Sequence, residues 1–225
     1  MTRYGGRHWL LAIGVSAIAG YVDAIGFLKL GGLFVSFMSG NSTRMAVGFV
    51  AEPHVALTAA RLLAGFVAGV IAGTLLAMAA GPYRKPVLLG FVGIVLALAA
   101  SSGVGLSDTL ATTAMTVAMG GANAIFQRDG EVSIGVTYMT GALVKLGQRL
   151  AAALVGGPRW QWAPYLALWG GLIAGAAAGA LAYPRAGMAS LWIAVAAAWL
   201  LCVYAALLGP AERLATRQDT MAREV

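Results

Sequence analysis

Long apolar runs separated by short polar breaks dominate the chain. Charged side chains are absent between Arg61 and Arg84 and again between Arg159 and Arg185, and each gap exceeds the ~20 residues that cross a bilayer core. The hydrophobic pattern therefore predicts about six membrane-spanning helices, at roughly 9–28, 58–80, 87–104, 109–126, 163–182 and 188–208.

Two further segments, 32–50 and 132–155, mix apolar residues with Ser, Thr, Asn, Gly and basic side chains. Each follows a short motif that occurs twice, as Gly-Tyr-Val-Asp-Ala-Ile at 20–25 and as Gly-Gly-Ala-Asn-Ala-Ile at 120–125. The chain therefore looks like two copies of one unit, and each copy is expected to contain a broken or re-entrant motif segment.

The duplication extends beyond this motif. Val-Ser-Phe-Met-Ser-Gly at 35–40 is echoed by Val-Thr-Tyr-Met-Thr-Gly at 136–141, and Pro-containing breaks follow at 81–86 and 183–185. The apolar run before each break carries glycines at four-residue spacing, which line one helix face and favour close helix packing. These glycines are Gly65, Gly69, Gly73, Gly171, Gly175 and Gly179.

The two copies divide one membrane domain into a first repeat at 1–104 and a second at 105–210, followed by a tail at 211–225. Three spans in each half would invert the second copy relative to the first, whereas four spans would make the copies parallel. We expect the inverted arrangement, which many secondary transporters share. Eleven Lys and Arg residues then fall on the side of both termini and four on the other, which predicts cytoplasmic termini.

Composition agrees with an all-α integral membrane protein. The 225 residues are 60% hydrophobic and 10% charged, whereas soluble domains carry about 25% charged residues. The net charge of +7 does not indicate nucleic-acid binding, because the basic residues lie at segment ends rather than along one stripe. Cys202 is the single cysteine, and no nucleophile–base or metal constellation is visible. We therefore expect no enzyme, no metal and no cofactor.

Asp23 is the one acidic residue well inside an apolar span, and Asn123 occupies the matching position of the second copy. An ionisable group at that depth usually faces a protein interior or water. Asp23 is therefore a candidate coupling or substrate-binding residue. The alternative is a structural hydrogen bond that holds the first turn of the motif segment. The uncharged Asn123 favours this alternative, because charge is then not required in both copies.

Hydroxyl and basic side chains are dense in both motif segments. Small hydroxyls can satisfy backbone groups at a broken helix, and a helix N-terminus with a nearby basic residue favours an anion. The alternative is that the hydroxyls only pack helices and the basic residues extend to headgroups. The candidate residues are Ser36, Ser39, Asn41, Thr43, Arg44, Thr137, Tyr138, Thr140 and Lys145.

These paired motifs resemble a known family. Gly20-x-x-Asp23-Ala24-Ile25 followed by Met38-Ser39-Gly40-Asn41, and the later Thr137-Tyr138-Met139-Thr140-Gly141, are similar to the DUF1275, or YoaK-like, bacterial membrane proteins. The resemblance covers most of the chain and implies a multi-pass protein of the bacterial inner membrane with about six spans. It implies no activity. Where the family usually has Thr-Gly-Asn, this chain has Ser39-Gly40-Asn41, which keeps the hydroxyl.

Together these patterns predict a small secondary transporter or permease for a polar or anionic small solute, with its site near the midplane between the two repeats. A passive channel and a non-transporting membrane scaffold are the alternatives. The expected partners are the lipid bilayer and the solute, and the small size and glycine-rich faces also fit a homodimer.

Overall fold

The computed structural model describes residues 6–101, 107–128, 131–132 and 134–209. The predicted tail at 211–225 lies outside the described residues. The described chain is helical, as expected, with one added pair of antiparallel two-residue strands, β1 (Gln127–Arg128) and β2 (Glu131–Val132). The α-helices are α1 (Gly6–Lys29), α2 (Met38–Ala51), α3 (Pro53–Ala80), α4 (Arg84–Ala100), α5 (Asp108–Ala122), α6 (Met139–Leu154), α7 (Ala163–Ala186) and α8 (Leu191–Leu208).

The end of α7 differs from the prediction made from the sequence. The expected break at 183–185 lies inside α7, which includes Pro184 and continues to Ala186. The helix ends instead at Gly187, whose φ of 54° suits a residue without a side chain. Gly81 ends α3 in the same way, with a φ of 52°. Both turns continue through short 3₁₀ segments, η1 (Gly81–Tyr83) and η4 (Gly187–Ser190).

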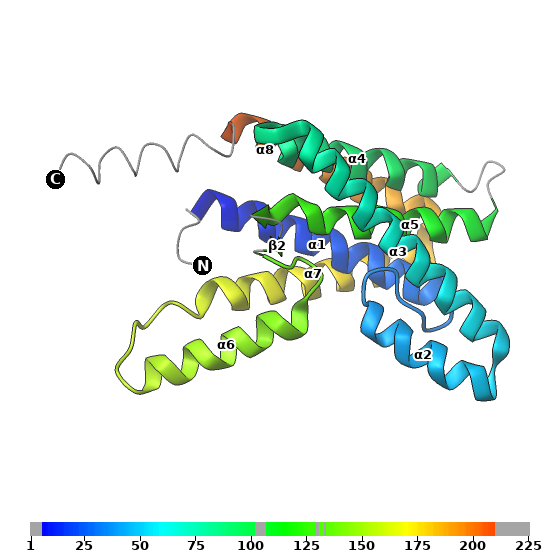
Figure 1. The fold of residues 1–225 in the computed structure, drawn as a ribbon, viewed down its shortest axis with the longest axis horizontal. Helices are drawn as coiled ribbons and strands as arrows, with labels where there is room; N and C mark the ends of the chain where they lie inside the picture. The colour runs from blue at the N-terminus through cyan, green and yellow to red at the C-terminus, as the bar shows by residue number, and fades with distance from the viewer. Residues whose placement is uncertain (1–5, 102–106, 129–130, 133, 210–225) are drawn as a thin grey trace.

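Three continuous helical stretches among the described residues are long and apolar enough to cross a membrane: Gly6–Lys29, Pro53–Ala100 and Ala163–Leu208. The second stretch has 48 residues, and a straight helix of that length would measure about 72 Å, more than twice a ~30 Å hydrocarbon core. It is instead folded back at η1, and the third is folded back at η4 (Figure 1). The α5 helix, with 15 residues, falls short of a full span by length alone.

The helices pair across the two halves of the chain. α1 packs against α7, α3 packs against α5, and α4 packs against α8. α1 and α5 begin the two halves and run in opposite directions (Figure 1). The first helix of each half therefore lies on the glycine-bearing helix of the other half.

The glycines lie at the closest points of these pairings. A Cβ on Gly69 would overlap the backbone carbonyl of Val117, and a Cβ on Gly175 would overlap that of Ala17. Gly20 meets the carbonyl of Leu172 in the same way. Because any side chain there would push the two backbones apart, glycine is required for this separation.

Large apolar side chains also cover the outside of the bundle. Val50 is 91% exposed, Leu207 80% and Met78 75%. In water such an apolar surface would cause the protein to aggregate, whereas in a membrane it can contact the lipid tails. α2 and α6 lie along the same side of the bundle, toward its opposite ends (Figure 1).

Candidate functional site

Asp23 lies late in α1 and holds the chain that precedes α2. One of its carboxylate oxygens, Oδ1, accepts the backbone N–H of Val35 at 2.7 Å and that of Ser36 at 2.9 Å. The chain leaves α1 at Lys29, returns along α1 in a non-helical stretch, and begins α2 at Met38. Asp23 therefore satisfies backbone donors that the broken segment leaves without helical partners.

Asn123 performs the matching task in the second half. It is the first residue of the 3₁₀ segment η3 (Asn123–Phe126), which directly follows α5. Its Oδ1 accepts the hydroxyl of Thr137 at 2.9 Å, and its Nδ2 donates to the carbonyl of Met119 at 3.0 Å. Asn123 and Thr137 are both buried. The repeat therefore keeps a polar contact between the end of the first helix and the motif segment, and changes its chemistry.

Asn41 makes a second contact in the first half. Its Nδ2 donates to the carbonyl of Phe34 at 2.6 Å, and its Oδ1 accepts the N–H of Phe34 at 2.9 Å. The side chain is fully buried in the first turn of α2. Ala142 stands at the matching place in the second half and offers no such pair. Asn41 thus acts on the backbone of its own segment.

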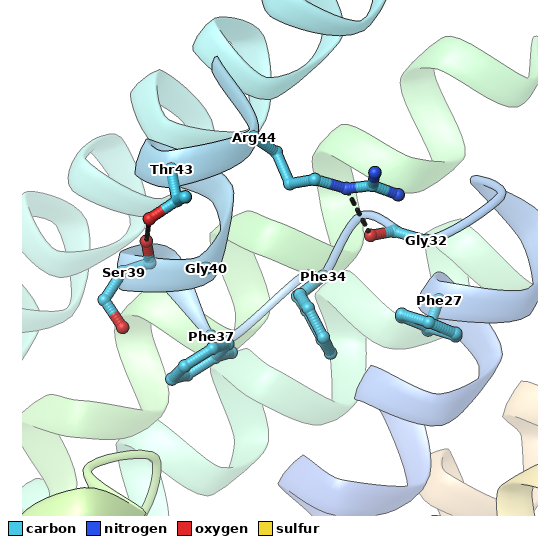
Figure 2. A pocket seen from close by; sticks show the side chains of 8 residues that line it. All are labelled: Phe27, Gly32, Phe34, Phe37, Ser39, Gly40, Thr43 and Arg44. Atoms are coloured by element: carbon cyan, nitrogen blue, oxygen red, sulfur yellow. Dashed lines mark hydrogen bonds between the residues drawn. The ribbon is translucent and has the colours of Figure 1, made fainter. Parts of the chain in front are cut away.

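An open pocket of about 580 Å³ lies between the end of α1 and α2 (Figure 2). Three of the candidate residues, Ser39, Thr43 and Arg44, come together there. The Arg44 guanidinium donates from Nε to the carbonyl of Gly32 at 3.2 Å and from Nη2 to that of Gly31 at 3.3 Å. The lining residues are Phe27, Gly32, Phe34, Phe37, Ser39, Gly40, Thr43 and Arg44.

Aromatic rings form much of this pocket, and the polar pattern of the sequence did not identify them. The ring centroids of Phe27 and Phe34 are 5.0 Å apart, and those of Phe34 and Phe37 are 5.2 Å apart. The spacing of Phe34 and Phe37 beside the hydroxyl run was visible, but Phe27 belongs to the preceding helix. Its approach depends on the return of the chain after Lys29, which only the fold reveals.

The other candidate residues lie elsewhere. Ser36 is buried, and its N–H is one of the two that Asp23 binds. Tyr138 and Thr140 are exposed at the start of α6, and Lys145 is half-buried on α6. These three do not line the pocket, which is built from residues of the first half alone.

The end of α1 is joined to the start of α5 by an ion pair. Lys29 Nζ lies 2.7 Å from Asp108 Oδ2. The side chain that caps α5 is that of Ser107, whose hydroxyl oxygen accepts the N–H of Leu110 at 3.3 Å. Asp108 is the first residue of α5 and pairs with a cation, while the residue before it caps the helix. The described residues hold no group of three His, Cys, Asp or Glu suited to a metal ion.

Comparison with known proteins now identifies the family. The family described as "Protein of unknown function (DUF1275)" matches residues 11–204. A UPF0700 transmembrane protein of Rhizobium meliloti (strain 1021) is 36% identical over 192 residues, which cover 85% of this chain and 83% of the relative. No solved structure shows a significant match. The predicted resemblance is confirmed, and the chain belongs to the DUF1275 family of proteins and is a transmembrane protein.

Proposed function

We propose that this protein is a small secondary transporter for a polar or anionic solute. The observation that carries the proposal is the doubled polar contact: Asp23 holds the segment before α2, and Asn123 with Thr137 holds the segment before α6. Transporters built from inverted repeats commonly place broken helices near the midplane, where unpaired backbone groups can contact a solute. Two broken segments in corresponding places are what such a site needs.

The helix pairing supports an inverted repeat. Each half places its first helix on the glycine-bearing helix of the other, so the halves are interlocked through two equivalent interfaces. The opposite directions of α1 and α5 fit a pseudo-twofold axis in the membrane plane. In this proposal six helices span the bilayer, while α2 and α6 enter it from opposite faces.

We further propose that the protein lies in the bacterial inner membrane with both termini in the cytoplasm. The start of α1, the η1 turn and the end of α8 lie at the same end of the bundle (Figure 1). Arg84 and Lys85 follow the η1 turn at that end. Basic residues accumulate on the cytoplasmic side of membrane proteins, so this end is assigned to the cytoplasm.

Counterflow in proteoliposomes tests the transport proposal. Vesicles loaded with unlabelled solute are diluted into a trace of the labelled solute, using benzoate, sulfate and alanine as separate probes. A carrier accumulates label transiently above equilibrium, because inward and outward steps share one site. Simple equilibration would indicate a channel. Absence of exchange with all three probes would contradict the transport proposal and favour the alternative of a non-transporting membrane scaffold.

Substitutions at the polar contacts add a control to the same assay. Asp23→Asn keeps an oxygen acceptor, and Asn occurs at the matching position of the second half. Counterflow that survives in Asp23→Asn with its proton dependence unchanged assigns Asp23 a structural task. Counterflow that survives while proton dependence is lost would assign it to coupling.

A further inference from the structure

We propose that the pocket beside α2 binds an organic anion with an apolar body, of which an aromatic carboxylate is the simplest example. The inference rests on the proposed transport function, because it names the substrate class of that same protein. It is carried by a juxtaposition in the pocket: the Arg44 guanidinium lies at one end and the rings of Phe27, Phe34 and Phe37 form the wall (Figure 2).

The positive charge of Arg44 favours an anionic ligand. The carbonyls of Gly31 and Gly32 accept two of its hydrogen bonds but carry no charge to balance it. Among the described residues, the carboxylates that form ion pairs are those of Asp108 and Glu52, and neither pairs with Arg44. Arg44 is exposed, so its guanidinium is open to a ligand anion, with which it can form charge-assisted hydrogen bonds.

The aromatic walls of the pocket favour an anion that also carries an apolar group. Phe27 and Phe37 each remain 41% exposed, and Phe34 lies between them with its ring near both. Exposed ring faces and edges at centroid spacings near 5 Å can accept another ring in offset or edge-to-face packing. A pocket of about 580 Å³ lies within the range of small-molecule sites, which is roughly 300–1,000 Å³. Inorganic anions would leave these rings uncovered.

Glycine makes room for both ends of the ligand. A Cβ on Gly32 would overlap the Arg44 guanidinium, and Gly32 has a φ of 106°, which favours glycine. A Cβ on Gly40 would lie 2.5 Å from the ring of Phe37. The two glycines therefore allow Arg44 and Phe37 to fold along the pocket, with the charged group at the Gly32 end (Figure 2).

Thermal unfolding of the purified protein in neutral detergent tests the binding directly. Sodium benzoate, benzyl alcohol, benzylammonium chloride and sodium chloride are titrated at matched ionic strength. We expect a saturable rise in Tm with benzoate alone, because a ligand that binds only the folded state stabilises it. Equal stabilisation by benzyl alcohol, or by sodium chloride, would overturn the proposal.

Variants locate the effect in this pocket. Arg44→Gln should weaken the apparent affinity for benzoate by about tenfold or more through loss of a charge-assisted contact. Arg44→Lys should retain much of it, and Arg185→Gln, at an exposed basic residue outside the pocket, should bind as the parent does. If Arg44→Gln fails to fold, Phe37→Leu carries the test: it removes an exposed aromatic ring from the pocket wall and keeps an apolar side chain, so the affinity for benzoate should fall while the fold is retained. Unchanged affinity for benzoate in folded Arg44→Gln, or in Phe37→Leu, would overturn the assignment.

An anionic lipid offers the same chemistry from another source. The titration is therefore repeated with phosphatidylglycerol in the micelles. Competitive loss of the benzoate effect places both ligands in one pocket, whereas Arg44-dependent stabilisation by phosphatidylglycerol alone would overturn the substrate proposal. Counterflow of sulfate or alanine without benzoate binding would refute this inference and leave transport standing. Benzoate binding without any counterflow would refute transport and leave the pocket as a binding site for an organic anion.

Discussion

Asp23 and Val35 are joined by a hydrogen bond of 2.7 Å between the carboxylate and the backbone N–H, and the same oxygen also accepts the N–H of Ser36. Thus the acidic residue that the sequence marked as a coupling candidate has a structural partner. The broken segment before α2 depends on it, because two backbone donors otherwise lack partners.

Substitution of Asp23 separates charge from hydrogen bonding. Asp23→Ala should lower the free energy of unfolding by about 2–4 kcal/mol, because two N–H groups lose their acceptor. Asp23→Asn should cost less than about 1–2 kcal/mol if its amide oxygen takes over the contact. Reversible unfolding in mixed micelles measures both. Equal destabilisation by the two variants would show that the charge itself, rather than the acceptor, holds the segment.

Asn41 should matter in the first half although alanine serves at the matching position of the second. Asn41→Ala removes both bonds to Phe34 and should destabilise the protein by about 1–3 kcal/mol. Amide hydrogen exchange at Phe34 should rise with it. Ala142→Ser is the matched change in the other half, where no equivalent pair exists to lose. Protected exchange at Phe34 in Asn41→Ala would contradict the assigned contact.

The glycine interfaces should tolerate no added methyl group. Gly69→Ala and Gly175→Ala would each place a Cβ against a backbone carbonyl of the facing helix, at a cost of about 1–3 kcal/mol each. Gly170→Ala is the control on the same helix as Gly175, because a Cβ there meets nothing within 4 Å. Thermal unfolding in detergent measures the difference. Similar Tm values for Gly170→Ala and Gly175→Ala would argue against tight packing.

Single-cysteine labelling should reveal the orientation of the two halves. Because Cys202 is the only cysteine, Cys202→Ser provides a cysteine-free background. The two test variants are Glu52→Cys and Arg159→Cys. Glu52 lies in the turn after α2, Arg159 lies in the connection after α6, and both are exposed. A membrane-impermeant maleimide added to intact cells should modify the first and not the second. Modification of both from one side would contradict the inverted arrangement.

The helices could be located from sequence because each local window carries its own signal. Charge-free apolar stretches between Arg61 and Arg84 and after Arg159 admit few structures other than membrane helices. The duplicated motif likewise pointed to polar contacts near Asp23 and Asn123. The predicted break near Pro184 was wrong: α7 continues through Pro184 to Ala186, and Gly187, with its positive φ, ends the helix.

The candidate site needed long-range structure. Glycines at four-residue spacing predict a close partner but not which one, since every apolar helix offers a similar surface. Only the fold placed the α1 backbone at Ala17 beside Gly175 and brought Phe27 to Phe34.

The sequence alone thus determined the membrane class and the helical character of the chain, because these follow from local hydrophobicity, and its repeated motif predicts two related halves. The tertiary structure alone decided that Asp23 binds the Val35 and Ser36 amides and that Arg44 shares a pocket with three phenylalanines. Those contacts depend on where the chain turns back after Lys29, and a turn's direction is set by the packing of the whole bundle.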